Sequence, residues 1–131
     1  MIWIPYAALL VAFALIYAPR VVVAREMGKQ TGGYDNHDIR GQQAQLAGLG
    51  KRALGAHNNG FEAFSPFAAG VLAAMQRGVA IDVVSGLAVA FIVLRVIYIA
   101  MYLGDRASLR TPIWSLATLC SAALLVLAVN H

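Results

Sequence analysis

Three polar residues with different chemistries lie on one face of a predicted helix in the middle of the chain. Arg52 and Asn59 are seven residues apart, and Glu62 follows three residues later, so all three fall within about 80° of one another around the helix axis. Glu62 lies about 15 Å along this helix from Arg52, which is hydrocarbon depth if the segment crosses a bilayer. A carboxylate there costs about 3 kcal/mol on insertion scales. We therefore expect Glu62 to have a cationic partner on another helix.

A second polar stripe provides that partner. Arg95, Tyr98, Tyr102 and Arg106 follow one another at spacings of three, four and four residues, so they share one helix face. Arg95 lies about 12 Å from the end of its apolar segment, a depth similar to that of Glu62. We predict a Glu62–Arg95 ion pair, within one subunit or across two. The same count of residues places these side chains at the mouth of the site: Arg52, Tyr102, Arg106 and Arg110.

Each of these residues also has a purely structural interpretation. Paired charges inside a membrane can hold helices in register without any chemistry. Tyrosines near a membrane surface are commonly interfacial anchors, and arginines beside a span determine topology. Two polar stripes on adjacent helices converge toward the same end of the bundle. This convergence favours a binding or catalytic site over a purely structural role.

Three other residues with reactive side chains do not join these stripes. His57 lies about 140° from Arg52 around the helix, so we expect it to pack against a neighbour. His37, with Asp35 and Asp38, falls short of a metal-ligand set, and no metal is predicted. Cys120 has no base or cation near it in sequence, which favours a packing role.

Composition indicates an integral membrane protein with a single domain. The 131 residues are 60% hydrophobic and only 12% charged, and the mean hydropathy is +0.70. A soluble domain of this size would have too little interior for that much apolar surface. The net charge is +4, but the basic residues flank apolar segments instead of forming a basic face, which excludes nucleic acid as a partner.

We expect an all-α, four-helix bundle that occupies residues 1–131 and contacts the lipid bilayer. Helices are required because the hydrocarbon core has no water to satisfy backbone groups. The tight connection at residues 76–78 predicts an antiparallel hairpin, and residues 42–49 could hold a helical turn. The expected spans are residues 2–24, 54–75, 79–103 and 111–129.

Basic residues predict the orientation. Eight of the ten lysines and arginines lie in or beside the first and third connections, residues 25–51 and 104–110. The positive-inside rule places these two loops in the cytoplasm and both termini outside.

The motifs resemble those of the MAPEG family, the membrane-associated proteins in eicosanoid and glutathione metabolism. The resemblance is carried by Asn59-x-x-Glu62 opening the second span, Arg95-x-x-Tyr98-x-x-x-Tyr102 closing the third, and the arginines that follow. Together with the four spans and the long first loop, it covers nearly the whole chain. The chain looks most like the small bacterial-type members.

The resemblance implies a homotrimer with glutathione bound between subunits near the cytoplasmic face. It implies glutathione contacts from Asn59 and Glu62, with Tyr98 and Tyr102 lining the site, and a thiolate stabilised by Arg110 or Arg106. A cation beside a thiol favours the nucleophilic thiolate. The implied activity is that of a glutathione transferase or peroxidase, with a lipophilic electrophile or peroxide reaching the site from the bilayer.

One departure from the family pattern keeps a second hypothesis open. Glutathione-using members commonly carry an arginine four residues before the motif asparagine, where this chain has Gly55. Arg52, one turn earlier, is the candidate substitute. The alternative is a membrane protein that keeps the fold but is non-catalytic or binds a different ligand. A small transporter has less support, because the sequence contains no inverted repeat.

Overall fold

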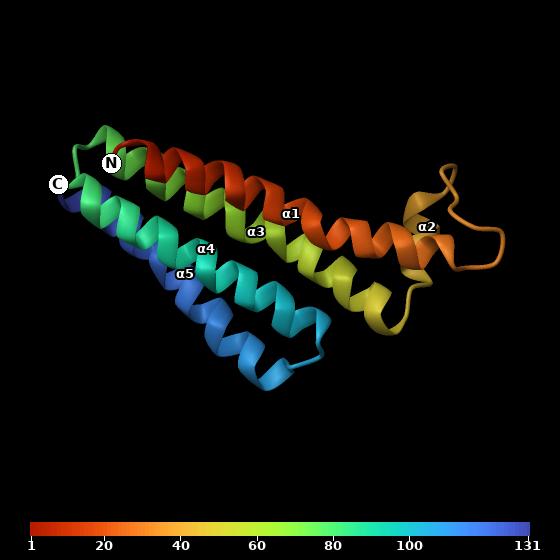
Figure 1. Cartoon of the computed structure of the whole chain (residues 1–131). Helices are drawn as coiled ribbons and strands as arrows, with labels where there is room; N and C mark the ends of the chain where they lie inside the picture. Colours follow the sequence, from red (N-terminus) through yellow and green to blue (C-terminus); the bar gives the residue numbers. More distant parts are fainter.

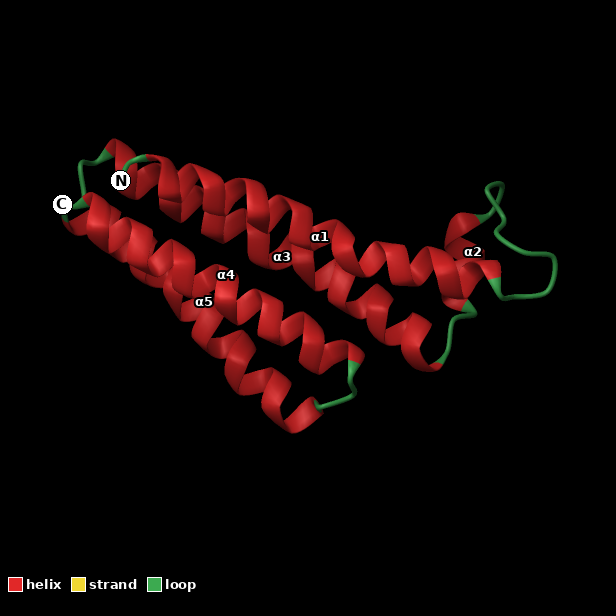
Figure 2. Ribbon diagram, in the orientation of Figure 1, coloured by secondary structure: helices red, strands yellow, loops and turns green.

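The computed structural model describes all residues from Met1 to His131, and the chain is entirely helical. Four long helices lie in an elongated arrangement. The α1–α3 and α4–α5 pairs lie together at the end that holds both termini and diverge toward the other end (Figure 1, Figure 2). Their bounds, together with those of the short helix α2, are α1 Trp3–Gly28, α2 Ile39–Ala44, α3 Gly48–Gln76, α4 Ile81–Leu103 and α5 Ala107–Asn130.

Helices α1, α4 and α5 are each long and apolar enough to cross a membrane. Helix α3 has the length, but its first half carries the polar residues Lys51, Arg52 and Asn59, and it does not reach the same apolar content. Three of the four predicted spans are thus supported by length and composition. Lipid is the natural surrounding for their outer faces, so the chain is an integral membrane protein.

The chain reverses between α3 and α4, as the tight connection predicted, but these two helices are not the main packing pair. Helix α1 packs along α3, and α5 packs against both α3 and α4. The turn Arg77–Ala80 reverses the chain between α3 and α4, and Gly78 at its centre adopts a φ of +79°, a conformation that glycine takes without steric cost. Both termini lie at this end of the molecule (Figure 1).

The apolar core depends on close approach between α3, α4 and α5. The rings of Phe67 and Phe91 stack at a centroid distance of 3.8 Å with an interplanar angle of 4°. At Gly70 an added Cβ would lie 2.9 Å from the Cβ of Leu124. A larger residue would push the α5 backbone away, so a small residue at position 70 sets the distance between α3 and α5.

The polar end of the molecule differs from the prediction in three ways. Helix α1 continues to Gly28 beyond the expected end at residue 24, and α3 begins at Gly48 instead of residue 54. The α1–α3 pair therefore projects beyond the α4–α5 pair (Figure 1). The predicted helical turn within 42–49 is displaced, because Asp38 caps α2 by accepting a 2.9 Å hydrogen bond from the Gly41 N–H.

Candidate functional site

Asn59 connects the two polar stripes. The Arg95 guanidinium on α4 donates through Nη1 to Asn59 Oδ1 at 2.8 Å. On α3, Asn59 donates through Nδ2 to Glu62 Oε2 at 2.9 Å. The carboxamide thus joins a cation and a carboxylate that do not touch each other.

The predicted direct Glu62–Arg95 ion pair is therefore wrong within one chain. Arg95 is only 4% exposed, whereas Glu62 is exposed on the outer surface of α3. The rotation of α3 turns Asn59 toward α4 and leaves Glu62 beside it, so the amide occupies the position expected for the carboxylate. Pairing of Glu62 with a second subunit stays a prediction.

Two aromatic rings extend this network toward the loop between α4 and α5. The Arg95 guanidinium carbon lies 4.3 Å from the ring centroid of Tyr98, a distance at which the cation is attracted to the ring face. Tyr98 in turn meets Tyr102 edge to face, with centroids 5.6 Å apart. The prediction of one shared helix face is confirmed for Arg95, Tyr98 and Tyr102. It is wrong for Arg106, because α4 ends at Leu103 and Arg106 lies at the start of α5.

Helix α5 contributes one arginine to the same surface. The guanidinium carbon of Arg110 lies 4.2 Å from the ring centroid of Tyr102. Arg106, by contrast, is exposed at the start of α5 and makes no such contact. Of the two arginines predicted for the thiolate, the structure brings Arg110 to the tyrosines. The resulting polar row runs from α3 through α4 to α5 and comprises Glu62, Asn59, Arg95, Tyr98, Tyr102 and Arg110.

Arg52 lies beside the Tyr102 end of the polar row, where its guanidinium binds groups at the C-terminal end of α4. Its Nε donates to the carbonyl oxygen of Leu103 at 3.2 Å, and its Nη1 lies 4.0 Å from a carboxylate oxygen of Asp105. The Leu103 carbonyl belongs to the last turn of α4, which has no helical partner for its acceptors. The sequence did not predict Asp105 as a partner of Arg52. Its backbone adopts a φ of +58° in the turn after α4, and this turn brings its carboxylate toward α3.

Gly55 lies directly against Tyr102. A Cβ at position 55 would lie 2.7 Å from Tyr102 Cζ and would collide with the hydroxyl. The phenol group of Tyr102 on α4 therefore occupies the space that a side chain at position 55 on α3 would fill. The glycine that departs from the family pattern has a packing partner that the sequence did not reveal.

The three other residues considered from the sequence lie away from the row. His57 is buried and its Nδ1 donates to the Ile16 carbonyl oxygen at 2.7 Å, so the expected packing role is confirmed. Cys120 packs beside the main apolar core, also as predicted. His37 is exposed in the first loop.

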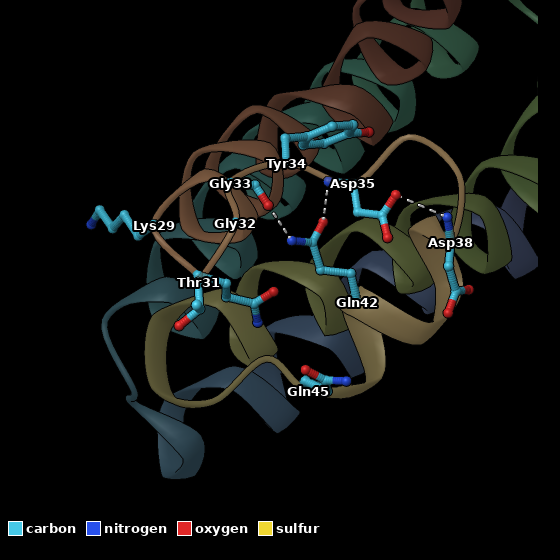
Figure 3. A pocket seen from close by; sticks show the side chains of 10 residues that line it. Lys29, Thr31, Gly32, Gly33, Tyr34, Asp35, Asp38, Gln42 and Gln45 are labelled. Carbon is cyan, nitrogen blue, oxygen red and sulfur yellow. Dashed lines mark hydrogen bonds between the residues drawn. The ribbon is translucent and has the colours of Figure 1, made fainter.

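The largest hollow in the chain, of about 680 Å³, lies in the loop after α1 (Figure 3). Gln42 organises this loop by donating to the carbonyl oxygens of Gly33 and Met27, at 2.7 and 3.2 Å, and by accepting from the Asp35 N–H at 2.9 Å. These polar groups satisfy the backbone of the loop itself, so they account for its shape without a ligand.

The polar row is an open surface in a single chain. Five hollows of the chain, with volumes from about 10 to about 680 Å³, are lined by none of Tyr98, Tyr102 and Arg110. Arg95 borders only a narrow gap between α1, α3 and α4. One chain therefore presents the polar groups without enclosing them.

Comparison with known proteins identifies the family of the chain. The model of the MAPEG family matches residues 4–130, a range that includes all five helices except the first residue of α1. Neither a curated protein nor a solved structure matches the chain. Because the match extends over nearly the full length, the chain belongs to the MAPEG family.

Proposed function

We propose that the chain forms a homotrimer of membrane-spanning four-helix bundles that binds glutathione between subunits and activates its thiol. The single observation that carries this proposal is the polar row, in which one exposed carboxylate and two arginines converge through Asn59 and two tyrosines. In this proposal α3 is the fourth span, and the loops after α1 and α4 face the cytoplasm.

Exposure of Glu62 supports assembly. A carboxylate on the outer surface of a membrane helix is costly at hydrocarbon depth, and its hydrogen bond from Asn59 satisfies only part of its acceptor capacity. A neighbouring subunit that covers Glu62 would remove it from lipid. The same contact would enclose the open polar row.

The charges of the row complement glutathione. The tripeptide carries two carboxylates and one ammonium group, so it requires cations and one anion at separate positions. Arg95 and Arg52 provide cations, and Glu62 provides the anion that would receive the ammonium. Tyr98 and Tyr102 lie between these charges and Arg110.

Arg110 is the residue that would stabilise the thiolate. The thiol proton leaves to solvent, and the guanidinium favours the sulfur anion that remains. The thiolate then attacks an electrophilic carbon, a sulfur–carbon bond forms, and the leaving group departs with its electron pair. A lipophilic electrophile would reach the row from the bilayer, along the part of the helix surface that the neighbouring subunit leaves uncovered.

Gly55 supports a second candidate function, a family member that is non-catalytic or differently liganded. With Tyr102 packed against Gly55, α3 has no cation at the position of the motif arginine. Loss of one charged hydrogen bond to a glutathione carboxylate weakens binding by about 10- to 100-fold. Arg52 compensates only if it leaves the Leu103 carbonyl.

A conjugation assay on purified protein separates the two functions. Turnover of glutathione with a generic aromatic electrophile, together with a trimeric mass in detergent, is expected for the enzyme. A trimer that neither binds glutathione nor forms the conjugate would favour the second function. A stable monomer in mild detergent and in lipid nanodiscs would contradict the assembly.

A further inference from the structure

A second charged hollow lies on the other side of α3 from the polar row. It has a volume of about 440 Å³ and forms where α1, α2 and the loop between them meet α3. We call it the basic hollow. Its lining includes Arg20, Arg40, Gln43 and His57, together with the carboxylate of Asp38.

The two arginines of the basic hollow have no carboxylate partner. The ion pairs of the chain are Lys29–Glu26 and Arg52–Asp105. Arg20 donates instead to the hydroxyl of Tyr34 at 3.1 Å, and Arg40 donates to Gln43 Oε1 at 3.0 Å. Asp38 is committed to the start of α2, where it accepts the Gly41 N–H. The hollow therefore has excess positive charge, which favours an anion.

Two buried side chains also present nitrogen atoms there. Gln43 is only 6% exposed. Its Oε1 accepts from Arg40, and its Nε2 donates to no group of the chain. His57 is 8% exposed, and its Nδ1 must carry the proton because the Ile16 carbonyl can only accept. Its Nε2 is thus left without a protein partner. Both side chains line the basic hollow, and the free Nε2 of Gln43 is a hydrogen-bond donor for a ligand there.

An apolar surface continues from the basic hollow along the membrane helices. The ring of His57 lies 5.8 Å from that of Tyr17 and 5.2 Å from that of Phe61. Phe13 continues the contact on α1, 5.3 Å from Tyr17. Phe13, Tyr17 and Phe61 form an aromatic strip, and each ring is about half exposed. The strip leads from the basic hollow toward the middle of the membrane-crossing part of α1.

We propose that the basic hollow and the aromatic strip together bind an anionic phospholipid. Arg20 and Arg40 contact the headgroup phosphate, Gln43 Nε2 donates to it, and an acyl chain lies along the aromatic strip. Basic hollows between membrane helices suit such headgroups. A free phosphate ion could bind in the basic hollow, but it has no acyl chain to contact the aromatic strip. The site does not include the polar row, so it is independent of glutathione binding.

Native mass spectrometry of the detergent-purified protein tests this site. The probes are phosphatidylglycerol, phosphatidylcholine of the same chain length and, as a competitor, glycerol 3-phosphate. The test variant is Arg20→Ala/Arg40→Ala. The matched control is Arg25→Ala/Lys51→Ala, which removes the same charge at exposed positions outside the hollow.

Wild type is expected to retain phosphatidylglycerol in preference to phosphatidylcholine, and glycerol 3-phosphate is expected not to displace it. The test variant should bind phosphatidylglycerol about 10-fold more weakly or worse, with the control unchanged. If the test variant does not fold, Arg40→Glu at an exposed position should give the same loss. Equal losses in test and control variants would overturn the proposal. Displacement by glycerol 3-phosphate would also overturn it and would assign the hollow to a soluble phosphate.

Discussion

The Tyr102 hydroxyl on α4 occupies the space that Gly55 leaves open on α3. This contact relates the departure from the family motif to the aromatic part of the polar row. Tyr102 also lies beneath the guanidinium of Arg110. Any side chain at position 55 must move the tyrosine and, with it, the surface on which the arginine rests.

The first prediction concerns this contact. Gly55→Ala should lower stability by about 1–3 kcal/mol through overpacking, offset in part by about 1 kcal/mol of gained helix propensity. Thermal unfolding in detergent measures the balance. Gly86→Ala is the matched control, because a Cβ there meets nothing within 4 Å, and it should be neutral or stabilising. Equal effects at both positions would show that Tyr102 does not fill the space above Gly55.

The second prediction concerns the amide bridge. Asn59→Ala should destabilise the fold by about 1–3 kcal/mol, because the buried Arg95 guanidinium loses its acceptor. Asn58→Ala, at the adjacent exposed position, should change the unfolding temperature little. An Asn59→Ala protein as stable as Asn58→Ala would mean that Arg95 finds its partner elsewhere.

The third prediction separates assembly from folding. Glu62 is exposed and Arg95 keeps its bond to Asn59 without it, so Glu62→Ala should leave helix content unchanged. It should weaken the trimer, which light scattering on detergent-solubilised protein at falling concentration measures. Asp82→Asn is the control, because Asp82 is an exposed acid in the first turn of α4, outside the polar row. Unchanged trimer stability in Glu62→Ala would refute the pairing of this carboxylate across subunits.

The fourth prediction concerns Arg52. If this arginine substitutes for the absent motif cation, Arg52→Ala should raise the KM for glutathione by about 10- to 100-fold and leave kcat nearly unchanged. Lys51→Ala removes a neighbouring exposed charge and should leave KM as it was. An unchanged KM in Arg52→Ala would limit the residue to holding the end of α4.

Periodicity was sufficient to predict the helices and the shared face of Arg95, Tyr98 and Tyr102. It also placed His57 away from the polar face, since angular separation on a helix follows directly from spacing. It could not determine which residue of α3 meets Arg95, because that depends on a rotation of the helix by a few tens of degrees. Asn59 and Glu62 are only about 60° apart around the helix axis, and in the structure Asn59 is the residue that meets Arg95.

Sequence patterns could not predict several other features. The Gly55–Tyr102 contact depends on the distance between two helices, and the basic hollow depends on how α2 folds back beside α1. The selection of Arg110 over Arg106 follows from the start of α5 at Ala107, earlier than the expected residue 111. Helix starts depend on local capping and loop geometry, which hydropathy does not encode.

The most direct test of the central claim is the ultraviolet absorbance of the glutathione thiolate bound to purified protein, compared among wild type, Arg110→Ala and Arg106→Ala. The polar row predicts a thiolate signal in wild type and Arg106→Ala, and its loss in Arg110→Ala, with conjugation falling about 100-fold or more. The trimer should stay intact in all three proteins. A full thiolate signal in Arg110→Ala, or none in wild type with glutathione bound, would contradict the account.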